Sequence, residues 1–72
     1  MSSQNRKSTI AKNIKKLRRE KGISQDRLSK LADLSLNTVV NIEAGSNPNP
    51  TIETLEKIAK AFGISIDELL KR

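Results

Sequence analysis

Two asparagines, Asn37 and Asn41, stand four residues apart in a stretch of the chain that is otherwise largely apolar. In a helix with about 100° per residue, Val39 and Ile42 define the buried side of this stretch, and the two asparagines fall on the opposite side. A solvent-facing helix surface normally carries Lys and Glu, so an amide pair flanked by the two aliphatics Leu36 and Val40 is unusual.

This combination suits the reading of base pairs in double-stranded DNA. An asparagine side chain can form a bidentate pair with N6 and N7 of adenine, and an aliphatic side chain can contact the methyl group of thymine. We therefore predict that Leu36, Asn37 and Asn41 form a base-reading face. The alternative is that both amides are merely hydrated and that Leu36 packs at the edge of the core.

The bulk composition excludes most other chemistry. The 72 residues are enough for one small domain, and they include no cysteine and no histidine. Disulfides, Cys/His zinc sites, thiol nucleophiles and histidine acid–base catalysis are thereby removed. The carboxylates and serines form no catalytic constellation. We expect no enzymatic activity, no metal, no cofactor and no small-molecule ligand.

Positive charge is concentrated in the first part of the chain. Residues 1–30 hold ten Lys or Arg and two Asp or Glu, residues 31–72 hold four and six, and the net charge is +6. This asymmetry indicates a polyanionic partner, although a basic helix that only aids solubility would look the same. The single aromatic residue, Phe62, offers no stacking platform for RNA. No apolar run could span a membrane and no signal peptide is evident, so we expect a soluble cytoplasmic protein.

The apolar spacing predicts five short helices and no strand. Most of them have a capping residue at the start and a glycine at the end. Residues 1–8 are expected to be a flexible basic arm and residues 9–72 the folded domain. The expected helices run from Ser8 or Thr9 to Gly22, from Ser24 to about Leu31, from Ser35 to about Ala44, from Thr51 to Gly63, and onward from Ser65. Leu28, Leu31, Val39, Ile42 and Phe62 are expected to face inward, and the other apolar residues with helical spacing are Ile10, Ile14, Leu17, Ile52, Leu55, Ile58 and Ala59.

The second and third expected helices are separated by only a few residues, which is the outline of a helix-turn-helix unit. Generic helical hairpins share this outline, so the individual residues are the more specific signal. Over roughly residues 10–70 the chain resembles the phage repressor and Cro-like (XRE-type) family. The resemblance implies an all-α, compact five-helix DNA-binding domain. It rests on Ser24-Gln25-Asp26-Arg27-Leu28, Leu34-Ser35, Thr38-Val39 and Ile42-Glu43-Ala44-Gly45, with further matches at Leu17-Arg18, Gly22-Ile23, Pro50 to Leu55 and Ile64 to Leu69.

The resemblance also implies roles for particular side chains. Leu36, Asn37 and Asn41 match base-contacting positions, and Gln25, Ser35 and Thr38 match positions that contact phosphate, Gln25 with a base also within reach. For Ser35 a purely structural capping role would be sufficient. The loop at residues 46–50 lacks the cations that the family often carries there. We therefore expect its backbone amides, the side chains of Ser46 and Asn47, and Arg6 and Lys7 on the arm to contact phosphate.

Three further positions bear on how the unit is built. Glu43 lies near the end of its helix, where a carboxylate opposes the macrodipole, so it needs a cationic partner. In the family this partner is the arginine that corresponds to Arg18. Asp33 stands where the family usually has a turn glycine, which implies a left-handed residue under some strain. Ser29 replaces the usual alanine, and its hydroxyl is expected to bond to the carbonyl of Gln25.

The end of the chain offers apolar residues for self-association. Ile66, Leu69 and Leu70 are the predicted dimer surface, although some of them could instead complete the monomer core. We predict a sequence-specific double-stranded-DNA-binding transcriptional regulator, a repressor or controller that binds a pseudo-palindromic operator as a homodimer. The alternatives are a protein-interaction module of the antitoxin type and the DNA-binding N-terminal part of a longer regulator.

Overall fold

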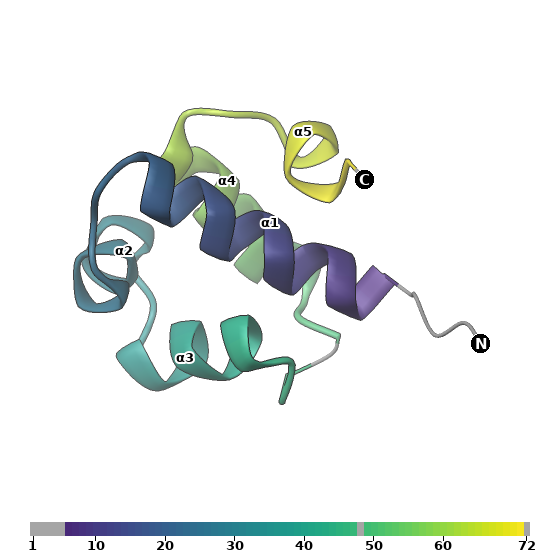
Figure 1. The fold of residues 1–72 in the computed structure, drawn as a ribbon, viewed down its shortest axis with the longest axis horizontal. Coiled ribbons are helices and arrows are strands. Elements are labelled where there is room, and N and C mark those ends of the chain that lie inside the picture. The colour runs from purple at the N-terminus through teal and green to yellow at the C-terminus, as the bar shows by residue number, and fades with distance from the viewer. Residues whose placement is uncertain (1–5, 48, 72) are drawn as a thin grey trace.

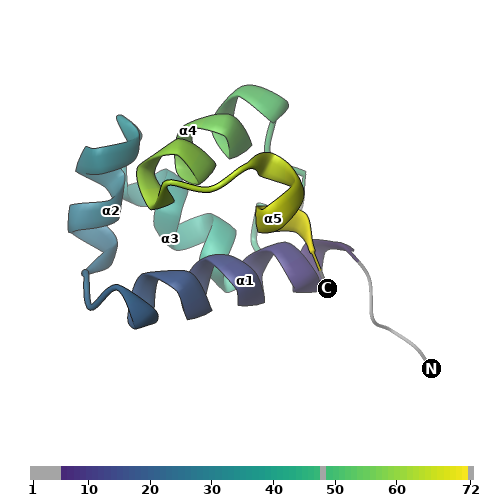
Figure 2. The ribbon, with the colours of Figure 1, turned by 90° about the horizontal axis from the view of Figure 1, so that it is seen from above.

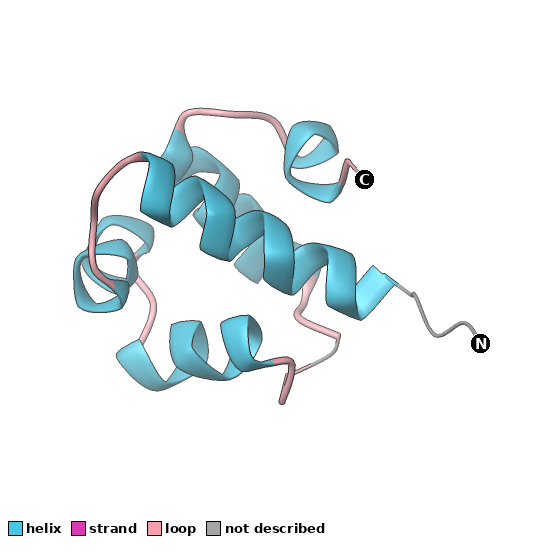
Figure 3. Ribbon diagram, in the orientation of Figure 1, coloured by secondary structure: helices cyan, strands magenta, loops and turns pink. Residues whose placement is uncertain are grey.

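The computed structural model describes residues 6–47 and 49–71, with side chains from Thr9 onward (Figure 1). This part of the chain folds into five α-helices and contains no strand (Figure 3), which confirms the all-α, five-helix prediction. The helices are α1 (Arg6–Glu20), α2 (Gln25–Ala32), α3 (Leu36–Ala44), α4 (Ile52–Phe62) and α5 (Ile66–Leu70).

The starts of the last four helices are fixed by hydroxyl caps, as the sequence predicts. Each cap accepts a hydrogen bond from the backbone N–H three residues later, which satisfies one of the free donors of the first turn. The oxygen–nitrogen distances are 3.0 Å for Ser24 and 3.1 Å for each of Ser35, Thr51 and Ser65. Because these signals are local, the sequence places the four starts correctly.

The helix ends depend on left-handed residues. Gly45 and Gly63 end α3 and α4 with φ of 83° and 74°, and Asp33 ends α2 with φ of 57° and ψ of 47°. Asp33 is the only non-glycine residue with positive φ in the described part of the chain. The left-handed conformation predicted for this turn is therefore present, and an aspartate adopts it less readily than a glycine does.

The first helix begins earlier than the sequence predicts. It starts at Arg6, so Ser8 and Thr9 lie inside the helix rather than at its N-cap. The apolar spacing of residues 10–17 gives no information about the residues upstream, so it does not predict the earlier start. The other end agrees with the expectation, because Gly22 with φ of 67° follows the last turn.

The core is formed by all five helices. Its buried apolar residues are Ile14, Leu28, Ala32, Val39, Ile42, Leu55, Ile58, Ala59, Phe62 and Leu69. The inward assignment of Leu31 is wrong, because this residue is 49% exposed, and the apolar Ile52 of α4 is 61% exposed. On α2 the buried positions beside Leu28 belong instead to the small residues Ser29 and Ala32, which let the neighbouring helices approach closely. On α4 the core contacts begin only at Leu55.

Ser29 is held differently from the prediction. Its hydroxyl donates to the carbonyl oxygen of Asp26 at 2.6 Å, one residue closer than the expected carbonyl of Gln25. The expected carbonyl belongs to the ordinary i−4 geometry, whereas the observed bond is the i−3 alternative that a serine rotamer can also reach. Either bond satisfies the buried hydroxyl.

The first helix lies at the centre of the arrangement. In Figure 1 it runs between α3 and α5, and it packs against both of them. In addition α2 packs on α3 and α4, and α5 packs on α4 (Figure 2). Within the described residues no helix has the length and apolar character needed to cross a membrane.

Candidate nucleic-acid interface

The outer face of α3 carries the three residues predicted to read bases. Leu36 is 43% exposed, Asn37 is exposed and Asn41 is half-buried, whereas Val39 and Ile42 on the other side of the helix are almost completely buried. Leu36 therefore projects into solvent instead of packing at the edge of the core. The one charged residue of α3, Glu43, is buried. The exposed surface of this helix thus consists of amides, small groups and aliphatics.

The hydroxyls of Ser35 and Thr38 lie together at the N-terminus of α3. Ser35 Oγ accepts the backbone N–H of Thr38, and the two hydroxyl oxygens are 2.8 Å apart. One of the two hydroxyl hydrogens is used in this contact, whichever group donates it. The other hydrogen can therefore donate to an outside acceptor such as a phosphate oxygen. Ser35 is a structural cap, and this does not prevent the pair from binding phosphate.

Arg18 and Glu43 form a bidentate ion pair that joins α1 to α3. Arg18 Nε lies 2.7 Å from Glu43 Oε2, and Arg18 Nη2 lies 3.1 Å from Glu43 Oε1. The two side chains are only 15% and 2% exposed. The hydrogen bond to Glu43, together with its charge, raises the pKa of Arg18 although burial opposes this. The Glu43 carboxylate, unfavourable at this end of a helix, is thereby neutralised.

The same pair also reaches α2 and the loop before it. Arg18 Nη1 donates to the carbonyl oxygen of Ile23 at 2.9 Å, and Gln25 Nε2 donates to Glu43 Oε1 at 3.1 Å. This contact of Gln25 is missing from the sequence-based interpretation, because it joins residues that are eighteen positions apart. An amide nitrogen carries two hydrogens, so Gln25 keeps one N–H for a phosphate while Glu43 holds the side chain in place.

The loop after α3 differs from the expectation in one respect. The backbone N–H groups of Ser46 and Asn47 donate to the carbonyl oxygen of Asn41 at 2.9 and 3.1 Å. These two amides complete the helix end and are not available to a phosphate without breaking it. Their side chains remain candidates, with Ser46 exposed and Asn47 half-buried. Phosphate contact in this part of the loop therefore depends on side chains rather than on the backbone.

Several cations lie along α1. The side chains of Arg6 and Lys7 lie outside the described residues. Farther along α1, Lys12, Lys16 and Arg19 are exposed. Among the residues that the structure describes, no ion pair involves these three cations. Their charge is therefore available to attract a polyanion.

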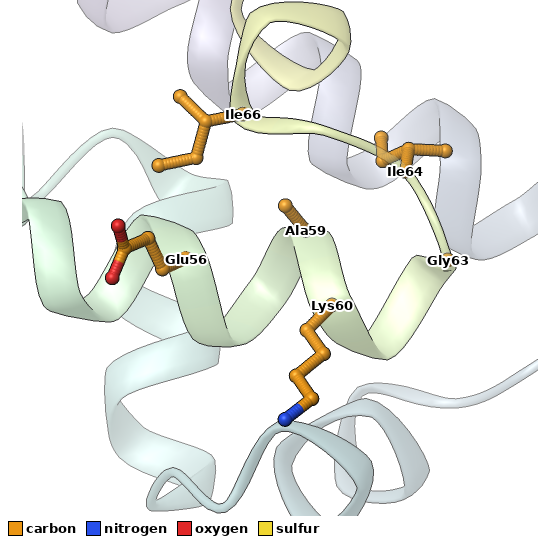
Figure 4. A pocket seen from close by; sticks show the side chains of 6 residues that line it. All are labelled: Glu56, Ala59, Lys60, Gly63, Ile64 and Ile66. Carbon is orange, nitrogen blue, oxygen red and sulfur yellow. The ribbon is translucent and has the colours of Figure 1, made fainter.

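The predicted self-association surface is smaller than expected. Leu69 is fully buried and belongs to the monomer core, so it cannot also contact a second copy. Leu70 is 37% exposed, and Ile66 is half-buried. Ile66 borders a groove between the end of α4 and the start of α5 (Figure 4), with Ile64 and Ala59 in the same lining. Of the three residues predicted for self-association, Ile66 and Leu70 remain partly exposed.

The fold and the exposed face of α3 together define a helix-turn-helix DNA-binding domain. A helix-turn-helix family model, HTH_3, matches residues 14–69, which is most of the chain. The chain therefore belongs to the HTH_3 helix-turn-helix family of the XRE/Cro–C1 type, and it is a DNA-binding transcriptional regulator domain. The small helix-turn-helix regulator domain of this family is non-enzymatic.

Individual relatives agree with this assignment. The chain is 36% identical over 61 residues to the HTH-type transcriptional regulator y4dJ of Sinorhizobium fredii, covering 85% of this chain and 78% of that protein. It is 34% identical over 62 residues to the immunity repressor of Bacillus phage phi105, covering 86% of this chain and 42% of the repressor. The restriction–modification controller C.AhdI of Aeromonas hydrophila has a similar structure, with a TM-score of 0.82 at 30% identity. That similarity covers 88% of this chain and 94% of the controller.

Proposed function

We propose that this regulator is a repressor or controller that binds a pseudo-palindromic operator in double-stranded DNA as a homodimer inside the cell. The outer face of α3 supports this proposal most strongly. It presents Asn37 and Asn41 for hydrogen bonds to base edges and Leu36 for a thymine methyl group. The exposed surface of α3 carries no charged side chain, so attraction to the DNA phosphates does not account for its composition.

We assign the contacts to the DNA phosphates to residues that surround the outer face of α3. Ser35 and Thr38 offer one free hydroxyl hydrogen, and Gln25 offers one free amide hydrogen. Ser46 and Asn47 lie just beyond the end of α3. Contacts to phosphate set the register of a protein on the duplex, and contacts to bases select the sequence. Arg6 and Lys7 are also proposed to contact the DNA backbone. Replacing either of them should therefore weaken binding to all sequences alike.

A dimer follows from the amount of sequence that one helix can read. A single recognition helix contacts only a few base pairs, which cannot single out one site among about a million or more competing genomic positions. Two copies on half-sites about one helical turn apart, roughly 34 Å, remove this difficulty. Leu70 and Ile66 supply the contact surface in this proposal. The names of two relatives, an immunity repressor and a restriction–modification controller, favour a role as a repressor or controller.

The base-reading role is tested by selecting genomic fragments with the purified protein and footprinting the best site. Asn37→Ala and Asn41→Ala should each relax the preference at one base pair, at a cost of about 1–3 kcal/mol on the best site. Asn49→Ala, the same change in the loop after α3, serves as the matched control and should not change the sequence preference. Equal losses on specific and random DNA would remove the two asparagines from the reading face. Failure to retain any fragment would favour the protein-interaction alternative.

The dimer is tested separately with Leu70→Asp. The variant should remain folded, bind the full operator less tightly and lose cooperativity, because a carboxylate in an apolar contact is costly. Leu31→Asp is the matched control, since Leu31 on α2 is also an exposed leucine and lies outside the proposed surface. A wild-type footprint over one asymmetric half-site, with one protein bound at saturation, would contradict the dimer.

A further inference from the structure

The fifth helix ends differently from the other helices. It has only five residues, and Lys71 after it is extended, with φ of −66° and ψ of 140°. The ends of α2, α3 and α4 are each followed by a left-handed residue that brings backbone N–H groups to the last carbonyls. Helices this short are not stable on their own. The Lys71 N–H donates to the carbonyl oxygen of Glu68 at 3.3 Å, which leaves the carbonyls of Leu69 and Lys71 for a donor outside α5.

Asn13 on α1 is that donor. Its Nδ2 donates to the carbonyl oxygens of Leu69 at 2.7 Å and of Lys71 at 2.6 Å, across 56 and 58 positions of sequence. An asparagine amide carries two N–H groups, so both can be used here. The side chain is half-buried between the two helices. The first helix thus supplies the C-terminal cap of the last helix.

The position of Asn13 relates this cap to the recognition helix. Arg18, which binds Glu43 of α3, lies five residues farther along α1, or about 7.5 Å along the helix axis. The α3 and α5 helices do not pack substantially on each other, and both pack on α1, on different sides of it in Figure 1. In the described part of the chain, α1 is the one helix that packs substantially on both α3 and α5, the helix that carries Leu70.

We propose that Asn13 is a positioning residue that fixes α5 to α1 and thereby sets the spacing between the two recognition helices of the DNA-bound dimer. The inference rests on the dimer proposed above and adds the residue that determines its geometry. When α5 is firmly held, the two α3 helices have a defined separation. Inserting one base pair moves a half-site by about 3.4 Å and rotates it, so a rigid dimer should reject the altered spacing. A dimer with loosely held α5 helices should tolerate it.

The experiment compares Asn13→Asp and Asn13→Ala with the wild type. Asn13→Asp keeps the size of the side chain but replaces the donor with an acceptor that faces two carbonyls. Affinity is measured for a single half-site, for the full operator, and for operators with one base pair inserted or deleted between the half-sites. Half-site affinity should stay within about twofold, whereas full-operator affinity should fall about tenfold, because loosely held α5 helices weaken the contact between the two copies. The preference for the natural spacing should largely disappear.

Loss of overall stability must be separated from loss of positioning. Ile58→Val is the control, because it removes one methylene group from the fully buried core and leaves the α1–α5 contact intact. Binding is compared at temperatures equally far below each variant's melting temperature, and the control should keep the wild-type spacing preference. Amide hydrogen exchange gives a readout that does not depend on DNA. The Leu69 N–H, which bonds to Ser65, should lose protection in the Asn13 variants, while amides in α3 keep theirs.

The outcomes distinguish this inference from the proposed function. Faster exchange in α5 together with relaxed spacing supports the role of Asn13. Unchanged exchange in α5, or an unchanged spacing preference in a cooperative dimer, overturns it. An equal change in the Ile58→Val control also overturns it. If the wild type saturates as a monomer without cooperativity, the dimer itself is wrong, and the positioning role is overturned with it.

Discussion

Removing the carboxylate of Glu43 should destabilise the fold more than most single changes in this chain. Glu43→Ala deletes the acceptor of three hydrogen bonds, two from Arg18 and one from Gln25, at 2.7 to 3.1 Å. Because the Arg18 side chain is only 15% exposed, its charge is left partly buried without a partner. Breaking a buried pair in this way costs about 3–5 kcal/mol. A chain of this size has a total stability of roughly 4–11 kcal/mol at 0.05–0.15 kcal/mol per residue.

A double-mutant cycle separates the pair from its surroundings. Urea unfolding followed by circular dichroism gives the free energy of unfolding for the wild type, Arg18→Met, Glu43→Leu and the double variant. Each single variant leaves one buried charge alone, whereas the double variant leaves an apolar pair. The double variant should therefore lose about 2–3 kcal/mol less than the sum of the single losses. Glu43→Gln provides a milder variant of the same shape if Glu43→Leu does not fold.

The pH dependence provides a second check on the pair. The folded-state pKa of Arg18 is raised, so the stability it contributes is fully present below the unfolded-state pKa and is lost only as the pH rises through the folded value. Both values lie far above neutrality, so mildly alkaline solution should not reduce the coupling between Arg18 and Glu43. Additivity of the two single losses within about 0.5 kcal/mol would refute the account of the pair.

Three further predictions concern stability and can be checked from melting temperatures and urea midpoints. Asp33→Gly should be neutral or should stabilise the fold by up to about 1 kcal/mol, because Asp33 is held in the left-handed region; a clear decrease would mean that its side chain is needed. Leu69→Ala should cost about 2–5 kcal/mol, whereas Leu70→Ala should cost much less, since Leu69 is fully buried and Leu70 is 37% exposed; equal losses would contradict this assignment of the core. Ser29→Ala should change stability by less than about 1 kcal/mol, because it removes a buried hydroxyl and improves helix propensity; a large loss would show that the bond to Asp26 matters.

The sequence predicts the helices well where their ends carry local signals. Ser24, Ser35, Thr51 and Ser65 are caps in the structure, and glycines follow α3 and α4 as expected. The start of α1 at Arg6 is missed, because no apolar or capping pattern marks it. Leu31 is wrongly placed in the core, since the apolar period of a short helix does not show that Ser29 and Ala32 occupy its buried side.

The candidate site is predictable to the extent that it lies on one helix. Leu36 and Asn37 are exposed on α3, as the helical period indicates. Contacts between distant segments are harder to predict without a related family. Gln25 bonds to Glu43 and Asn13 caps α5 only because the tertiary fold brings these groups together. No local pattern around Asn13 distinguishes it from an ordinary surface amide.

The separation of the two sides of α3 has a consequence for the evolution of new operators. Leu36, Asn37 and Asn41 lie apart from Val39 and Ile42, which hold the helix in the core. Exposed surface positions usually change stability by no more than about 0.5 kcal/mol when substituted, so Leu36 and Asn37, two of the proposed reading residues, can vary at little cost to the fold. A duplicated gene could therefore acquire a different target by a few substitutions on one side of this helix. Residues from a related regulator could be grafted onto the same positions while the scaffold stays unchanged.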